Sequence, residues 1–439
     1  MKLRYRFTLS LLVYGLVAAC AHAQDFYWNV ASARSMALGG AYVPSNAGVL
    51  DALATNPAGL TSLNARTVNL SLTSVFARGS FSNSVNRDAP LHTSPGVLPY
   101  GAFGAPIGRS RFSFGVGVLP ELMSVADWSY VDAPGVGGAS YGLQKHKSAI
   151  LAARSVAGLG VTLHPNLSVG VAVGAVYNAN TLQAPYIFQS HPALKGLKTL
   201  LDLHTTGFGW NTSVGVLARP TRKLLVGLSW KSRTVIDSEG DASGNAGRQF
   251  EVLGIPFRPD FHYSAKVHNV LPQSVVAHVT WQAKPRWLLA FQSDWVNWKN
   301  AFVTLPVTLT NGTNADINGL LGTNSISDGI PLDWKDRVSF HGGFERLVTE
   351  SISLRGGYAH GNNPVPGSTL SPLTSAIMSN QLTTGLGYRR GRCRLDLAYA
   401  YQLTGQARTQ RSALLSGEYS NSVVRAGTQS LALNTSFQF

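Results

Sequence analysis

Side chains capable of acid–base chemistry occur in one suggestive arrangement in this sequence of 439 residues. His341 and Glu345 are four positions apart, so on a strand both would project from the same face. A histidine beside a carboxylate can transfer protons, but a water-filled protein interior commonly carries such groups without catalysis. The eleven histidines form no pair at metal-ligand spacing on an expected strand, and no Gly-rich phosphate loop ending in Lys-Ser or Lys-Thr is present. The sequence therefore predicts no catalytic residue, no metal and no cofactor.

Arginines inside alternating segments are the second group able to do chemistry. Arg154, Arg355, Arg389 and Arg394 fall on the polar face of the segments that contain them. An arginine facing lipid near mid-membrane would cost roughly 2 to 4 kcal/mol, so in membrane-crossing segments all four should face the interior. There they can pair with carboxylates on neighbouring strands, or one or two can hold an anionic ligand head. The candidate carboxylates are Asp294, Glu345 and Asp396, and the candidate ligand-binding arginines are Arg154, Arg355 and Arg389.

The segments that position these residues alternate between apolar and polar side chains, which places successive side chains on opposite faces of a β-strand. In the last segment Leu431, Leu433 and Phe437 share one face, whereas Asn434 and Ser436 share the other. About fourteen such strands can be placed, an even number as bacterial single-chain barrels require. The expected strands span residues 66–77, 97–106, 111–119, 148–163, 166–178, 207–218, 222–232, 273–283, 286–296, 336–347, 350–359, 381–390, 392–402 and 427–439.

The links between the expected strands alternate between short and long. Residues 164–165 and 284–285 are tight turns, whereas 179–206, 233–272 and 297–335 are long links. A soluble β-sandwich also alternates apolar and polar residues, but it has no reason to alternate the lengths of its loops. Short periplasmic turns and long extracellular loops are typical of a transmembrane barrel. The sequence therefore predicts an all-β, antiparallel barrel in the outer membrane of a Gram-negative bacterium.

The first residues have the organisation of a secretory signal. Three basic residues precede an apolar stretch at residues 7–19, and Ala21-His22-Ala23 forms a small-x-small cleavage site. Cys20 follows Val17-Ala18-Ala19, which also fits a lipoprotein cleavage box. We expect cleavage after Ala23, with lipidation of Cys20 as the alternative.

The composition agrees with a membrane-embedded sheet. Charged residues make up 13% of the chain, about half the usual globular share. After the signal, no run approaches the roughly 18 apolar residues of a transmembrane helix. The net charge of +15 is scattered and not gathered on one stripe, which argues against nucleic acid and favours anionic outer-membrane lipid and lipopolysaccharide as partners. Cys393 alone remains in the mature chain, so no intramolecular disulfide is expected.

Residues 24–65 do not alternate and are rich in small and apolar side chains. They contain Gly39-Gly40 and the turn-forming Asn56-Pro57-Ala58-Gly59. A barrel of about fourteen strands encloses more space than its own side chains fill, so this segment is available as a plug inside the lumen. The expected domains are a signal peptide (1–23), an N-terminal hatch (24–65) and a β-barrel (66–439).

These motifs resemble the N-terminal hatch of the FadL family of outer-membrane long-chain fatty acid transporters. The similarity rests on residues 32–42, on Asp51 and on residues 56–60, and it extends over essentially the mature chain. It implies a fourteen-stranded barrel for the uptake of hydrophobic compounds, above all long-chain fatty acids. Some members carry aromatic hydrocarbons, which need no carboxylate partner, and a general diffusion porin is the remaining alternative. The chain departs from the family at Glu121-Leu122-Met123, where a Phe-Gly pair is expected.

The resemblance also implies a sideways exit at an inward kink of the third strand, against which the hatch lies. In this sequence Gly115 and Gly117 lie in that strand, which ends at Pro120. Glycine within a strand marks a bend and proline removes a ladder hydrogen bond. We therefore expect the kink at these three residues.

The long link at residues 179–206 carries leucines that would fall on one side of a short helix. We expect Leu194, Leu197 and Leu201 to capture apolar solutes at the mouth of the barrel, with packing against a neighbouring loop as the alternative. The terminal Phe439 on an alternating strand is the expected signal for the outer-membrane assembly machinery. We expect the protein to be a monomer.

Overall fold

The computed structural model describes residues 31–92, 95–417 and 419–439. The expected signal peptide and the choice between Ala23 and Cys20 lie outside these residues. No helix in the described part of the chain is long and apolar enough to cross a membrane.

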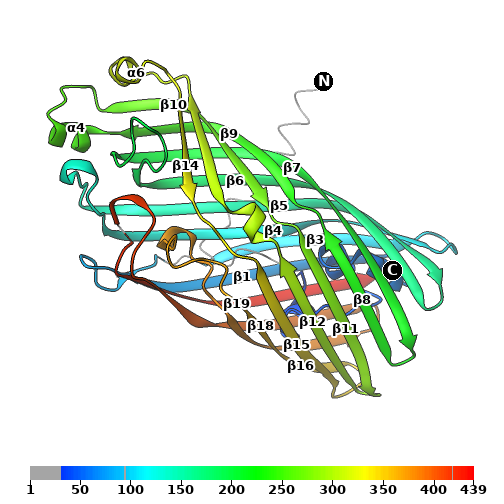
Figure 1. The fold of residues 1–439 in the computed structure, drawn as a ribbon. Helices are drawn as coiled ribbons and strands as arrows, with labels where there is room; N and C mark the ends of the chain where they lie inside the picture. Colours follow the sequence, from blue (N-terminus) through cyan, green and yellow to red (C-terminus); the bar gives the residue numbers. More distant parts are fainter. Residues whose placement is uncertain (1–30, 93–94, 418) are drawn as a thin grey trace.

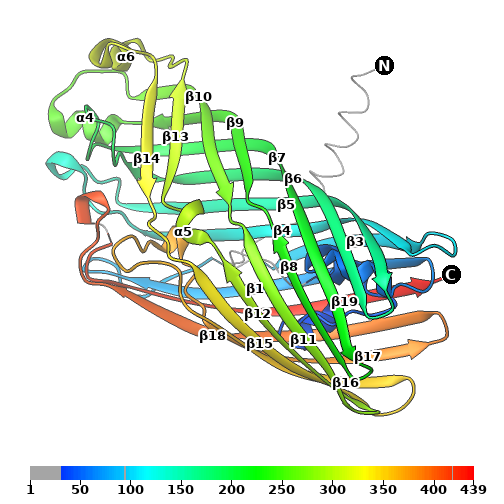
Figure 2. The ribbon, with the colours of Figure 1, turned by 45° about the vertical axis from the view of Figure 1, so that its right-hand side comes forward.

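A closed ring of fourteen antiparallel strands forms the body of the molecule (Figure 1, Figure 2). The ring closes because β1 pairs with β19 on one side and with β3 on the other. Its strands match the fourteen predicted from the alternation, so the predicted fold class is confirmed. They are β1 (Thr67–Ser82), β3 (Gly96–Pro106), β4 (Phe112–Val131), β5 (Leu143–His164), β6 (Leu167–Ile187), β7 (Lys198–Thr221), β8 (Leu224–Lys231), β11 (Ser274–Lys284), β12 (Trp287–Val296), β15 (Arg337–Leu347), β16 (Ile352–Gly361), β17 (Asn380–Arg390), β18 (Cys393–Thr409) and β19 (Ser422–Gln438).

The two faces of the ring differ as the alternation requires. In β19, Leu431, Leu433 and Phe437 are exposed on the outside, whereas Asn434 and Ser436 are buried toward the interior. An apolar exterior with a polar interior inverts the pattern of a soluble sandwich and is that of a lipid-embedded barrel.

One end of the barrel, called here the loop end, carries further strands of the same sheet and several short helices. The additional strands are β2 (Ala89–Pro90), β9 (Thr234–Asn245), β10 (Asp260–Leu271), β13 (Thr304–Thr310) and β14 (Ile326–Pro331). The helical elements outside the N-terminal segment are η2 (Val136–Gly138), α4 (Gly247–Leu253), α5 (Trp298–Ala301), α6 (Ala315–Leu321), η3 (Pro372–Thr374) and η4 (Leu415–Gly417).

The predicted helix in the link at residues 179–206 is wrong. Strands β6 and β7 continue as a hairpin from the ring into this region, and residues 188–197 alone connect them. The loop-end half of β7 pairs with β9, whereas its other half pairs with β8. Leu201 and Leu203 therefore lie on one face of a strand, where both are buried, and no helical face is formed.

The N-terminal segment, residues 31–65, lies inside the ring near the opposite end, called here the turn end (Figure 1). It contains α2 (Ala33–Ala37), α3 (Val49–Ala54) and η1 (Pro57–Ser62). Its residues are mostly buried although the elements are short. Short helices are marginal on their own, so the surrounding strands must hold this segment in place.

Candidate functional site

Asn56 fastens the third helical element of the N-terminal segment to the barrel wall. It is fully buried, and its side-chain oxygen accepts from the Ala58 backbone N–H at 3.1 Å, which caps η1. Its Nδ2 donates to the carbonyl of Val216 at 3.1 Å. The wall makes room with glycine: a Cβ on Gly170 would lie 2.3 Å from the Ala58 nitrogen. The residues of the Asn-Pro-Ala motif thus touch the wall directly.

Gly39 places the first turn of the same segment against the opposite wall. Its φ is +73° and that of Gly40 is +90°, values that favour glycine. A Cβ on Gly39 would also lie 2.7 Å from the backbone oxygen of Tyr358. The Gly39 N–H donates to Thr383 Oγ1 at 2.9 Å, and His341 Nδ1 lies 2.7 Å from the Gly39 carbonyl. His341 therefore holds the backbone of this segment, and the structure gives it no acid–base role with Glu345.

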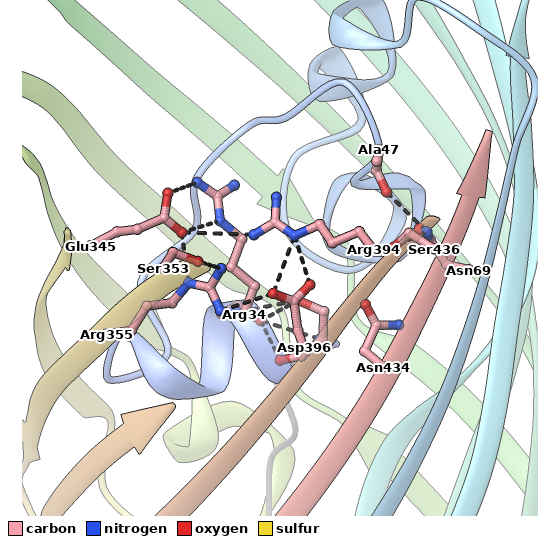
Figure 3. A network of polar contacts seen from close by, with 12 residues as sticks. Arg34, Ala47, Asn69, Glu345, Ser353, Arg355, Arg394, Asp396, Asn434 and Ser436 are labelled. Carbon is pink, nitrogen blue, oxygen red and sulfur yellow. Dashed lines mark hydrogen bonds and ion pairs between the residues drawn. The ribbon is translucent and has the colours of Figure 1, made fainter. Parts of the chain in front are cut away.

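A network of buried charges joins α2 to strands β15, β16 and β18 (Figure 3). Arg34 donates from Nε and Nη2 to the two oxygens of Glu345, at 2.9 and 3.0 Å. Arg355 donates from Nε to the same carboxylate at 2.6 Å and forms an ion pair with Asp396 at 2.8 Å. Arg394 also meets Asp396, at 2.8 Å. Arg355 and Arg394 thus take the carboxylate partners that the sequence offered as the alternative to a ligand.

The two other predicted arginines lie in different places. Arg154 is 1% exposed and contacts the Leu53 carbonyl of the N-terminal segment at 3.3 Å and Ser213 at 3.1 Å. Arg389 is exposed at the turn end of β17. The structure therefore does not bring the three candidate ligand-binding arginines together into one site.

The wall of the barrel is interrupted beside β4. The pairing of β4 with β3 ends at Val118 with Gly101, although β4 continues to Val131. A bulge between Pro120 and Leu122 shifts its register against β5. Beyond the bulge, residues 121–128 are buried on both faces. Here β4 has lost β3 but keeps its pairing with β5 as far as Val131, and both of its faces are covered.

The predicted position of the kink is partly wrong. Gly115 and Gly117 remain paired on both sides, with Gly104 and Ala102 of β3 and with β5. A Cβ on Gly115 would lie 2.8 Å from Leu60 Cδ2, so this glycine makes room for η1. The bend starts at Pro120, where the missing N–H removes a ladder bond.

A cavity of about 480 Å³, called here the exit cavity, occupies the gap that β4 leaves. Three of its lining residues, Leu151, Ala153 and Tyr177, are partly exposed and alternate with buried residues along β5 and β6. They therefore belong to the outer face of the barrel. The exit cavity is lined by Leu98, Pro99, Tyr100, Val118, Leu119, Pro120, Leu122, Met123, Leu151, Ala152, Ala153 and Tyr177. The lipid-facing side of the wall is thus hollowed by an apolar cavity at this place.

A second cavity of about 960 Å³, called here the outer cavity, lies at the loop end. Leu194, Leu197 and Leu201 all line it, although from the β6–β7 hairpin and not from a helix. An inner cavity of about 1070 Å³ shares part of this lining, including Leu182 and Tyr186. The inner cavity reaches Ala149 and Ile150 of β5, next in the chain to residues of the exit cavity. Apolar spaces therefore follow one another from the loop end to the gap beside β4.

A polar cavity of about 1010 Å³ lies on the other side of the lumen, next to α2. Its lining includes Met36, Asp294, Arg337 and His341. His341 Nε2 and Asp294 form an ion pair at 3.2 Å when the histidine is protonated. In the described ranges, no three His, Cys, Asp or Glu side chains are placed to hold a metal ion.

Two charged contacts were missed in the sequence. Arg34 lies in a segment of mostly small and apolar residues, so its sequence context indicates no ion pair. Glu121 forms a buried ion pair with Lys231 at 2.6 Å across the lumen. A carboxylate within a largely apolar strand was the available signal, because such a group requires a partner.

Comparisons with known proteins give consistent matches. A family model described as outer membrane protein transport protein (OMPP1/FadL/TodX) matches residues 14–439. Comparison with curated proteins finds no match. Among solved structures, a Pseudomonas aeruginosa FadL homologue superposes with a TM-score of 0.77 at 16% identity, covering 94% of this chain and 100% of that one. The toluene transporters TodX of P. putida and TbuX of Ralstonia pickettii give TM-scores of 0.75 and 0.71 at 18% identity, each covering 94% of this chain and 99% of theirs.

Proposed function

The chain belongs to the outer membrane transport family OMPP1/FadL/TodX, and from this premise we propose that its hydrophobic substrates leave sideways through the barrel wall. It is an outer-membrane β-barrel channel for hydrophobic compounds and not an enzyme. The route has three stages: capture in the outer cavity, passage through the inner cavity, and release through the exit cavity. The loop end faces the outside of the cell in this proposal.

The observation that carries the proposal is the interruption of the sheet beside β4. There β4 loses β3 after Val118, although its pairing with β5 continues as far as Val131. A strand edge without a pairing partner would be costly in hydrocarbon. We infer that β4 turns inward here, which takes its edge away from the lipid and leaves the apolar exit cavity in that place. A solute that prefers lipid gains nothing from release into periplasmic water. A sideways exit delivers it to the bilayer instead.

The N-terminal segment supports this direction of release. Its Leu53 and Leu60 pack in one apolar cluster with Leu119 and Met123 of β4. The segment thus lies between the place where β4 turns inward and the turn end, and it blocks the lumen there. A general diffusion porin would need an open polar pore, which this arrangement disfavours.

Long-chain fatty acids and aromatic hydrocarbons are the two candidate substrate classes. Both have an apolar body that the cavities can surround. The solved relatives TodX and TbuX are toluene transporters and CymD is a monoaromatic hydrocarbon channel, which supports the second class. Contacts with lipopolysaccharide, recognition of Phe439 by the assembly machinery and the monomeric state stay predictions.

Filling the exit cavity tests the route. Ala153 lines this cavity from β5, whereas Ala157, four residues along the same strand, faces lipid outside it. We expect Ala153→Trp to reduce uptake of a hydrophobic compound by cells, with Ala157→Trp as the matched control at the wild-type rate. Heat-modifiable migration verifies folding of both variants. Wild-type uptake by a folded Ala153→Trp variant contradicts the sideways route.

A further inference from the structure

The outer cavity is apolar but has two charged residues in its lining, Lys198 and Asp328. A free lysine here would attract a carboxylate, and a free aspartate would repel one. The partners of these two side chains therefore decide which molecules can enter.

Lys198 is occupied by an internal carboxylate. Its Nζ lies 2.5 Å from Asp132 Oδ2, both side chains are fully buried, and the ammonium also donates to the Ala133 carbonyl. Asp132 is fixed in turn by Ser140 Oγ at 2.7 Å and by the Tyr141 N–H at 3.2 Å. The loop after β4 thus places a carboxylate beside Lys198, the one cation that the described residues contribute to this lining.

The Asp328 carboxylate also has internal partners. It accepts from the Tyr186 hydroxyl at 2.6 Å, from Ser190 Oγ at 2.6 Å and from the backbone N–H groups of residues 189–191. These donors come from the β6–β7 hairpin. The carboxylate is therefore part of the wall and presents no open acceptor to the cavity.

The remaining apolar spaces offer no compensating charge. The linings of the inner cavity and of the exit cavity contain no Asp, Glu, Lys, Arg or His among the described residues. An ionised carboxylate entering these spaces would lose its water without gaining a counter-ion, which is strongly unfavourable. A substrate carboxylate that displaced Asp132 from Lys198 would leave the Asp132 carboxylate buried without a partner, which is also unfavourable.

We propose that the Asp132–Lys198 ion pair is a specificity determinant that bars carboxylates from the outer cavity. Asp132 lies behind the lining of the cavity and neutralises the lysine that could otherwise attract a substrate carboxylate, so the cavity accepts uncharged apolar molecules. The aromatic side chains of the lining suit such molecules, because Phe261 and Tyr263 pack edge to face at 5.8 Å and leave apolar rings toward the space. This inference rests on the proposed function and selects the uncharged class of substrate.

The test compares binding of laurate and of methyl laurate, which share an apolar chain, to the purified full-length protein at about pH 8, where the acid is ionised. We expect the wild type to bind the ester at least about tenfold more tightly than laurate. Asp132→Asn keeps the shape and hydrogen-bonding oxygen of the side chain but frees the lysine charge. It should raise laurate affinity by about tenfold or more, with little change for the ester.

Two further proteins make the result unambiguous. The double variant Asp132→Asn with Lys198→Met should lose the gain for laurate, because no cation remains. Asp237→Asn, which removes an exposed carboxylate on β9 outside the cavity, is the matched control and should behave as wild type. Equal affinity of the wild type for both probes overturns the proposal. So does a folded Asp132→Asn variant with unchanged laurate affinity.

Wild-type protein alone provides a second measurement that needs no variant to fold. If only the uncharged acid enters, laurate affinity should fall as pH rises from about 4 to about 8, whereas that of the ester should stay constant. A pH-independent laurate affinity contradicts the specificity. Unimpaired ester uptake in the Ala153→Trp variant would instead overturn the route, so the two failures are distinguishable.

Discussion

Replacing Glu345 by glutamine should release α2 from the barrel wall. This carboxylate is the point at which Arg34, Arg355 and Arg394 converge, and Arg34 makes both of its ion-pairing hydrogen bonds to it. Asp396 still compensates the other two arginines in the variant. Removing one partner of a buried pair costs about 3 kcal/mol, because the remaining charge stays buried without compensation. That corresponds to about a hundredfold rise in the population with α2 detached.

Hydrogen exchange of the backbone amides of residues 33–41 in the reconstituted protein measures this population. Arg34→Met should have a smaller effect than Glu345→Gln, about 1 to 2 kcal/mol, since Glu345 keeps two arginines. Arg389→Met, at the exposed turn end of β17, is the matched control. Protection of α2 in Glu345→Gln equal to that in the wild type would refute the view that these charges hold the segment.

Three further predictions concern the segment and the loop end. Gly115→Val should push η1 away from β4, because its Cβ would already approach Leu60 Cδ2 to 2.8 Å, and planar-bilayer recordings should show increased ion conductance. Asn56→Ala should destabilise η1 by about 1 to 3 kcal/mol through loss of the cap and of the wall contacts, measured as faster exchange at Ala58. Burial alone would raise the pKa of Asp328, but hydrogen bonds from neighbouring donors outweigh it and lower the pKa. Stability from this group is therefore present above its unfolded pKa of about 4 and lost as pH falls through the lower folded value, so exchange in β14 should accelerate in acid while that in β19 stays slow.

The barrel could be predicted from the sequence because its physics is local. Alternation with period two fixes which face of each strand meets lipid, and every turn-end link is short, so the fourteen ring strands were located without any long-range information. The helix predicted within residues 179–206 is wrong for the same reason. Where strands extend beyond the membrane, their side chains no longer alternate between lipid and lumen, and a group of leucines then fits a helix as well as a strand.

The site was less predictable because it depends on contacts between distant residues. Parity correctly placed Arg355 toward the interior, but its partner Asp396 lies two strands away and is fixed by register. Sequence spacing also gave no sign that Asp132 meets Lys198, because a loop and a strand must fold before these residues approach. The bend at Pro120 was foreseeable from proline, whereas Gly115 proved to be a packing contact.

The most direct test of sideways release is the anomalous scattering of a brominated alkylbenzene diffused into crystals of the wild-type protein. The proposal predicts bromine density in the outer and inner cavities and in the exit cavity between Pro99 and Ala153, with none between the N-terminal segment and the turn end. Continuous density past α3 and η1 to the turn end, with an empty exit cavity, would contradict it.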